Sequence, residues 1–283
     1  MSFTTLISAA QLRDRLGNPD CCIIDVRHQL LDTGYGESAY WAAHLPGAFF
    51  LHCDRDLSGP MDGRNGRHPL PDPVVLAEKL GGIGISPQTQ VVVYDDAQGM
   101  IAARLWWLLR WLGHDAVAVL DGGWQAWLAQ GGELDQALPL ASPTHFPVSL
   151  RDFAVDVRFV EKTLQRTAPD LGFCLVDARA ADRFRGENET IDPVGGHIPG
   201  AINAFFRDNL AADGCFKSAG ALREMWLQIL NGRPAEQVVH YCGSGVSACH
   251  NLLAMEIAGL PGARLYGGSW SEWCADPGRA LAR

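Results

Sequence analysis

The chain has 283 residues, of which 47% are hydrophobic and 19% are charged. At about 150 residues per domain this length predicts about two domains, and the composition excludes a disordered or fibrous chain. The formal net charge of −9 disfavours binding to nucleic acids, which requires a basic surface. No apolar run approaches the ~20 residues that cross a bilayer, and residues 1–10 lack the features of a secretory signal. We therefore expect a cytoplasmic protein with neither a nucleic-acid nor a membrane partner.

The eight cysteines are too sparse for a disulfide scaffold, and none forms the CxxC pairs of a zinc site. A free cysteine usually packs as a small apolar residue. We therefore expect most of them to be reduced and buried, so a cysteine with a chemical role must be recognised by its surroundings.

The sequence contains two copies of one pattern. The stretches at 23–27, 44–48 and 92–95 recur in the same order at 175–179, 197–201 and 239–242, and a Gly-Gly and tryptophan motif recurs with them, at offsets of 146 to 153 residues. A spacing as long as a domain predicts a duplicated domain and not a solenoid of short units. Three prolines between 139 and 147 favour extended backbone. We therefore predict an N-terminal domain at 1–138, a linker at 139–153 and a C-terminal domain at 154–283.

The pattern within each copy alternates strands with helices. Short apolar runs at 22–26, 91–94, 117–120, 173–176 and 238–241 predict buried strands. Helical patterns at 100–112 and 246–258 end before Gly113 and Gly259, which suit helix C-termini. Such alternation predicts an α/β fold, present twice, in which a mainly parallel sheet is flanked by helices on both faces.

The two copies differ most in the turn after one predicted central strand. From Asp95 the first copy reads Asp-Asp-Ala-Gln-Gly-Met, whereas from Cys242 the second reads Cys-Gly-Ser-Gly-Val-Ser-Ala. Gly243 and Gly245 allow the backbone N–H groups to point inward, and the following helix adds its positive dipole end, so this turn predicts an anion cradle. We expect Cys242 to be a partly exposed nucleophile. Carboxylates in the first copy would repel anions, which predicts that this copy is catalytically silent.

These motifs resemble those of the tandem-domain sulfurtransferases, the rhodanese and 3-mercaptopyruvate sulfurtransferase group. The resemblance rests on the Asp-x-Arg after the first strand of each copy, Gly-His-Ile-Pro-Gly-Ala at 196–201, the loop from Cys242 and the Gly-Gly-x-x-Trp-type ending. It implies two rhodanese-like domains, of which the first, with Asp95 at the cysteine position, is inactive. It also implies that Cys242 carries sulfur as a persulfide to a small thiol, thioredoxin or cyanide, with no metal or organic cofactor.

The loop composition bears on the sulfur donor. Family members that use thiosulfate carry Arg and Lys directly after the cysteine, whereas this chain has Gly243 and Ser244. The resemblance therefore favours 3-mercaptopyruvate, with pyruvate as product and Ser244 assisting catalysis, and thiosulfate is the alternative donor. The expected cradle for the sulfur consists of Gly243, Gly245, Val246, Ser247 and Ala248.

The same branch binds its donor with two arginines, and the first matches Arg183. No arginine occurs at 187–196, where Thr190 takes the expected place of the second. Either Arg185 or Arg179 replaces it, or the donor preference is relaxed. Because Arg27 repeats Arg179 in the silent copy, a structural salt bridge is the favoured interpretation of Arg179, and Arg185 is favoured as a solvated surface residue.

The first copy also contributes residues to the site in this branch, and His68 and Asp54 match those positions; each could equally be a surface residue. Residues present in both copies are interpreted as structural: His44 with His197, Asp25 with Asp177, and Trp124, Trp127, Trp270 and Trp273 as core.

Three other functions fit the sequence less well. A cysteine phosphatase requires an arginine six residues after the cysteine, where this chain has Ala248. A thioredoxin-like oxidoreductase requires a resolving cysteine at the position of Ser244, and the nearby Cys249 falls inside a predicted helix. A tandem module that only binds a partner or senses redox state remains the non-enzymatic alternative, and it predicts no sulfur transfer.

Overall fold

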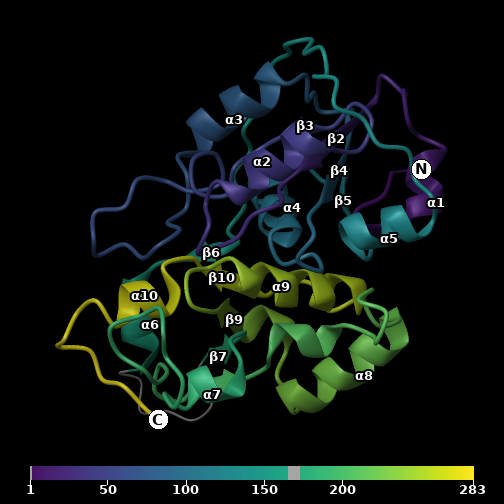
Figure 1. Ribbon diagram of the computed structural model, residues 1–283. Coiled ribbons are helices and arrows are strands. Elements are labelled where there is room, and N and C mark those ends of the chain that lie inside the picture. The colour runs from purple at the N-terminus through teal and green to yellow at the C-terminus, as the bar shows by residue number, and fades with distance from the viewer. Residues whose placement is uncertain (1, 165–172) are drawn as a thin grey trace. The chain divides into compact units, whose positions relative to one another are not determined.

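The chain forms two compact units in a computed structural model that describes residues 2–164 and 173–283 (Figure 1). The first unit comprises Met1–Gly59, Pro71–Arg151 and Asp213–Cys215, and the second comprises Pro60–Leu70, Asp152–Ala212 and Phe216–Arg283. Each half of the chain thus gives a short segment to the unit that the other half builds. This exchange matters for the site because residues 60–70 belong to the second unit.

The first unit is built on a five-stranded sheet with the strand order β1-β5-β4-β2-β3, in which all neighbouring strands are parallel. The strands are β1 (Leu6–Ile7), β2 (Cys21–Asp25), β3 (Phe49–Phe50), β4 (Gln90–Tyr94) and β5 (Val117–Leu120). Strands β4 and β5 are buried along their whole length, as expected of a parallel sheet that is covered on both faces.

The helices of the first unit lie around these strands (Figure 1). Two of them start at clear sequence signals: Ser8 forms a capping box with Gln11, and Asp72 caps a helix whose first residue is Pro73, a residue favoured at that position. The helices are α1 (Ala9–Arg13), α2 (Tyr35–Ala42), α3 (Pro73–Gly82), α4 (Ala102–Trp111) and α5 (Gly123–Ala129).

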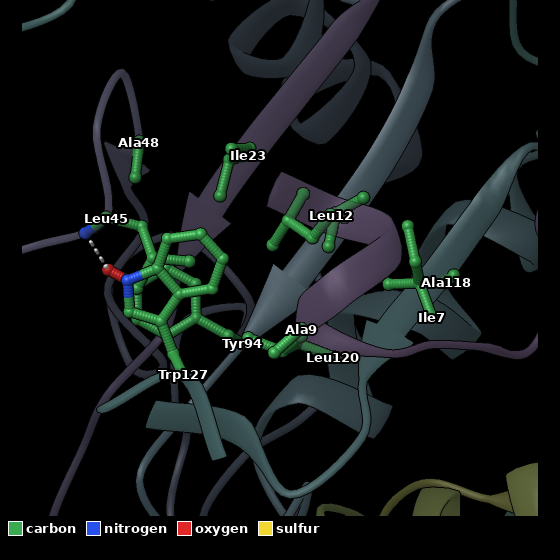
Figure 2. Close-up of a cluster of buried hydrophobic side chains, with 11 residues drawn as sticks. Ile7, Ala9, Leu12, Ile23, Leu45, Ala48, Tyr94, Ala118, Leu120 and Trp127 are labelled. Atoms are coloured by element: carbon green, nitrogen blue, oxygen red, sulfur yellow. Dashed lines mark hydrogen bonds between the residues drawn. The ribbon is translucent and has the colours of Figure 1, made fainter. Parts of the chain in front are cut away.

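The core of the first unit packs α1 and α5 against one face of the sheet. Leu12 and Trp127 contribute to a cluster with the strand residues Ile23 and Ala118. Figure 2 shows this cluster, within which the Leu45 backbone N–H donates a hydrogen bond to the Tyr94 hydroxyl at 3.2 Å. Helix α4 contacts β4 and β5 and contributes nothing to this cluster, so it covers the opposite face.

The second unit repeats this plan with the strand order β6-β10-β9-β7-β8, again with parallel neighbours. Its strands are β6 (Ala154–Val155), β7 (Cys174–Asp177), β8 (Ile202–Asn203), β9 (Val238–Tyr241) and β10 (Arg264–Tyr266). Strand for strand the order matches that of the first unit, which confirms the duplication.

The helices of the second unit also repeat those of the first. Val160 of α6 and Trp270 and Trp273 of α10 pack on one sheet face, and α9 contacts β9 and β10. The helices are α6 (Val157–Leu164), α7 (Ala181–Phe184), α8 (Ala219–Leu230), α9 (Ser247–Ile257) and α10 (Ser269–Trp273), with 3-10 turns η1 (Phe206–Asn209) and η2 (Ala235–Gln237).

The predicted fold class is confirmed: both units are α/β with a parallel sheet and flanking helices. The two predicted helices appear as α4 and α9, each followed by a glycine of positive φ, Gly113 and Gly259. Trp127, Trp270 and Trp273 are buried as expected, whereas Trp124 is partly buried against the first core. Within residues 2–164 and 173–283, no helix is both long and apolar enough to cross a membrane.

Candidate active site

Cys242 directly follows β9 and opens the loop that leads into α9. It therefore lies at the carboxyl edge of a parallel sheet, where α/β folds bind their ligands. The expectation of a partly exposed cysteine is wrong, because Cys242 is only 2% exposed. The exchanged segment lies close to this loop: a Cβ atom at Gly243 would lie 2.9 Å from Arg67 Nη2, and one at Gly267 would lie 3.1 Å from Leu70 Cγ.

The loop brings a backbone amide to the sulfur atom. The Gly245 N–H donates a hydrogen bond to Cys242 Sγ at 3.2 Å, which agrees with inward-pointing amides. Gly245 has a φ of +80°, and a Cβ atom there would lie 2.3 Å from the Gly267 carbonyl oxygen. Only glycine fits this position. Ser247 and Ala248 then begin the eleven-residue helix α9, whose N-terminal end favours negative charge.

Ser244 and His68 form a buried pair beside the cysteine. Their side chains are joined by a hydrogen bond of 2.7 Å between Ser244 Oγ and His68 Nδ1, and each residue is only 5% exposed. The structure thus brings together two residues that are far apart in the sequence and that both belong to the second unit. A hydroxyl bound to an imidazole can pass a proton in either direction.

A network of ion pairs lies next to the loop. Arg183 holds Glu189 through two contacts of 2.8 and 2.9 Å and also lies 3.4 Å from Asp192, which in turn pairs with Arg67. The side chains of Glu189 and Asp192 are 4% and 2% exposed. The full network alternates in sign and has a formal charge of zero: Asp177, Arg179, Glu189, Arg183, Asp192 and Arg67.

Two cations border the first residue after the cysteine. A Cβ atom at Gly243 would lie 2.9 Å from Arg67 Nη2 and 3.7 Å from Arg183 Nη2. Burial lowers the pKa of the Arg67 guanidinium, Cys242 raises this pKa, and the like charge of Arg183 lowers it again. Two guanidinium groups that face one point favour an anion there.

Arg179 has the structural surroundings expected of it. It pairs with Asp177 at 2.7 Å and donates to the Gly196 carbonyl oxygen at 2.6 Å. The counterpart Arg27 pairs with Asp25 at 2.6 Å in the first unit. A contact that both copies make stabilises the fold and does not distinguish an active copy.

Two other predicted donor-binding residues form ion pairs outside this network. Arg185 is 51% exposed and forms an exposed ion pair with Glu187 at 2.7 Å. Asp54 belongs to the first unit, where its carboxylate lies 3.6 Å from His28 Nε2. The roles suggested for both residues stay predictions.

The repeated histidines also bind backbone groups. His44 Nδ1 lies 2.8 Å from the Tyr40 carbonyl oxygen, and His197 Nδ1 lies 2.9 Å from that of Phe184. Each imidazole stacks on the ring of the residue whose carbonyl it contacts. Equal contacts in both units fit a structural role.

Three of these charged residues were not predicted from the sequence: Arg67, Glu189 and Asp192. Arg67 directly precedes His68, which the sequence did single out, but only the exchange of residues 60–70 brings it to the loop. The stretch 187–196, which lacks the expected arginine, instead supplies the two carboxylates that hold Arg183 and Arg67. A search for complementary charges in that stretch could have found them.

A cysteine at the carboxyl edge of a parallel sheet, with a backbone amide of the following loop on its sulfur, is the arrangement expected of an enzyme with a cysteine nucleophile. The family model for the rhodanese-like domain matches this chain twice, over residues 8–130 and 157–276. The chain belongs to the rhodanese family.

Several relatives and solved structures extend over most of the chain. A Pseudomonas aeruginosa protein named "Probable 3-mercaptopyruvate sulfurtransferase" is 49% identical, covering 100% of this chain and 99% of its own. A Mycobacterium tuberculosis protein, provisionally named as a thiosulfate sulfurtransferase, is 40% identical, covering 98% of this chain and 96% of its own. The solved structure of 3-mercaptopyruvate sulfurtransferase from Leishmania major is 30% identical with a TM-score of 0.83, covering 95% of this chain and 74% of that chain.

Proposed function

We propose that this protein, a sulfurtransferase by its family, moves sulfur from 3-mercaptopyruvate to a thiol or cyanide acceptor through a persulfide on Cys242. The observation that carries this proposal is the contact between Cys242 Sγ and the Gly245 amide in a loop bordered by Arg67 and Arg183. A nucleophilic sulfur and a site for an anionic group lie side by side there.

The first half-reaction begins with attack of the Cys242 thiolate on the donor sulfur. A sulfur–sulfur bond forms and the donor carbon–sulfur bond breaks, so its electron pair leaves on carbon as pyruvate enolate, which takes up a proton to give pyruvate. In the second half-reaction, a thiolate or cyanide attacks the outer sulfur. The sulfur–sulfur bond breaks and the Cys242 thiolate returns.

The amides of the loop stabilise the negative sulfur species. Gly245 already donates to Cys242 Sγ, and residues Gly243 and Val246 to Ala248 complete the cradle. Backbone dipoles fixed before the reaction stabilise charge without reorganising. The same donors serve the thiolate and the persulfide in turn.

Ser244 and His68 supply the proton path. Their hydrogen bond of 2.7 Å fixes the Ser244 hydroxyl beside the loop, two residues from the nucleophile. We assign to this hydroxyl the transfer of a proton to the pyruvate enolate, with His68 restoring the proton.

Arg183 and Arg67 bind the donor carboxylate, so Arg67 takes the role of the second arginine that 187–196 lacks. Because the ion-pair network has no net charge and Gly243 and Ser244 are neutral, the site suits a donor with one carboxylate better than a dianion. Thiosulfate is the second candidate donor. The name of the 40% identical relative favours it, and two guanidiniums can also hold a sulfonate-like group.

The donor is tested by measuring kcat/KM for 3-mercaptopyruvate and thiosulfate with the same cyanide acceptor. We expect a strong preference for 3-mercaptopyruvate, and Arg183→Ala should lower kcat/KM for that donor. The exposed Arg185→Ala is the matched control and should change little. A preference for thiosulfate would overturn the donor assignment, and activity with neither donor would favour the binding module.

The roles of the domains and the location complete the proposal. The N-terminal rhodanese-like domain at 1–138, with Asp95 at the cysteine position, is silent, and the domain at 154–283 is catalytic. All eight cysteines are free thiols in the structure, which supports a reducing compartment and hence the cytoplasm. Small thiols or thioredoxin are the proposed acceptors.

A further inference from the structure

Ser269 adopts a backbone conformation that side chains other than glycine rarely take. It is the first residue of α10, has a φ of +57° and is fully buried. The left-handed region costs an ordinary residue energy, and such strain persists where the surroundings hold it in place. A serine in this strained conformation therefore suggests that its side chain has a function that glycine could not provide.

The Ser269 hydroxyl makes two hydrogen bonds, and one of them is to the backbone of Cys242. Ser269 Oγ donates to the Tyr266 carbonyl oxygen at 3.0 Å and accepts the Cys242 backbone N–H at 3.2 Å. A hydroxyl has one proton, and Tyr266 receives it, so Ser269 cannot also donate to a substrate. The next residue, Trp270, donates its N–H to the Cys242 carbonyl oxygen at 3.0 Å. Both backbone groups of the nucleophile are thus held by two consecutive residues.

The first unit holds the counterpart residue in the same left-handed conformation but without a hydroxyl. The counterpart of Ser269 is Gly123, with a φ of +56°, and the following Trp124 donates its N–H to the Asp95 carbonyl oxygen at 2.8 Å. A Cβ atom at Gly123 would lie 2.4 Å from that same oxygen. A side chain at this position therefore fits only in the second unit, which carries the cysteine.

We propose that Ser269 is a positioning residue for the sulfur transfer, a proposal that rests on the proposed function of Cys242. By holding the Cys242 N–H, its hydroxyl fixes the first peptide of the loop and keeps Sγ against the Gly245 amide. The strain at Ser269 is offset by this bond.

The test compares Ser269→Ala, which keeps the strain and loses the hydroxyl, with Ser269→Gly, which loses both. In both variants we expect kcat with 3-mercaptopyruvate and the alkylation rate of the Cys242 peptide to fall about three- to tenfold, the effect of one hydrogen bond. KM should stay within about twofold, because the donor-binding arginines are untouched. Ser269→Gly should unfold at no lower temperature than Ser269→Ala, because glycine relieves the strain.

Asn231→Gly is the matched control, because Asn231 has a φ of +48° at the exposed end of α8. It should leave both rates unchanged. Unchanged kcat and alkylation in a folded Ser269→Gly variant would overturn the positioning role and leave only a structural one. The alkylation rate needs no donor, so failure of this proposal is distinct from a wild-type protein that transfers no sulfur.

Discussion

The loops after β4 and β9 share one backbone plan but hold different side chains, an aspartate in the first unit and a cysteine in the second. In the first unit, the Asp95 carboxylate is fully buried and accepts four backbone N–H groups at 2.8 to 2.9 Å, from Ala97, Gly99, Ile101 and Ala102. In the second unit, Gly245 is the counterpart of Gly99, with φ angles of +80° and +85°, and its amide meets Cys242 Sγ.

This difference teaches how one amide cradle serves two purposes. In the first unit the cradle is filled by a carboxylate of the chain itself, so it stabilises the fold and leaves no room for a sulfur anion. In the second unit a thiol replaces the carboxylate, and the counterparts of Ile101 and Ala102 are Ser247 and Ala248. We therefore propose that these two amides receive the outer sulfur of the persulfide.

The largest expected effect comes from removing the nucleophile. Cys242→Ser should lower turnover by a factor on the order of 10⁴ or more, because a hydroxyl cannot form the persulfide. Steady-state assays with 3-mercaptopyruvate and cyanide measure it. Cys174→Ser, a change of another buried cysteine in the same unit, should keep its activity. Equal activity of Cys242→Ser and wild type would refute the assignment of the sulfur carrier.

The counterpart change in the first unit should affect stability and not chemistry. Asp95→Ala leaves four buried amides without their acceptor, so we expect the free energy of unfolding to fall by about 3–5 kcal/mol. Urea unfolding measures this loss. Asp96→Ala, next in the chain and only partly buried, should cost much less. A similar cost for both variants would show that the filled cradle does not stabilise the first unit.

The donor-binding role of Arg67 predicts a smaller effect. Arg67→Ala removes charge-assisted contacts worth about 1.5–3 kcal/mol, so kcat/KM for 3-mercaptopyruvate should fall about 10- to 100-fold. Arg64→Ala, an exposed change in the same segment, is the control. If Arg67→Ala keeps the wild-type kcat/KM, the second cation must be sought elsewhere.

His240 predicts a pH dependence that the residue at the equivalent position of the first unit cannot have. It is fully buried on β9 where the first unit has Val93, its Nε2 lies 3.0 Å from Met255 Sδ, and burial lowers the pKa of His240 to about 3. The unfolded pKa is about 6.5, so the fold excludes a proton that the unfolded chain binds. Stability is fully present above that pH and is lost as pH falls towards 3, by up to about 1.4 kcal/mol per pH unit.

The His240 prediction is measured by urea unfolding at several pH values between 7 and 4. His240→Val, which copies the first unit, should have a shallower loss of stability than the wild type. A constant offset between the two proteins does not affect this comparison of slopes. Parallel slopes would mean that His240 does not contribute.

The fold and the position of the candidate nucleophile could be predicted from the sequence because both rest on local patterns. Apolar runs and glycine-terminated helices define α/β units, and the duplication isolates Cys242 by contrast with Asp95. The confirmed strand at 238–241 placed the cysteine at the edge of the sheet without any knowledge of distant contacts.

The features of the site that could not be predicted depend on contacts between segments far apart in the chain. The placement of Arg67 beside the loop follows from the exchange of residues 60–70, which no local pattern encodes. The burial of Cys242 likewise could not be read from the local sequence. Ser269 could not be recognised from the sequence for a different reason. It shares its left-handed conformation with Gly123, and only the φ angles of the two residues reveal that a serine occupies a position suited to glycine.

The most direct test of the account is the mass of the Cys242 peptide after the protein has reacted with 3-mercaptopyruvate in the absence of an acceptor. We predict one added sulfur atom on this peptide, and its removal by cyanide with release of thiocyanate. Turnover without any added sulfur on Cys242, or sulfur on a different cysteine, would contradict the account.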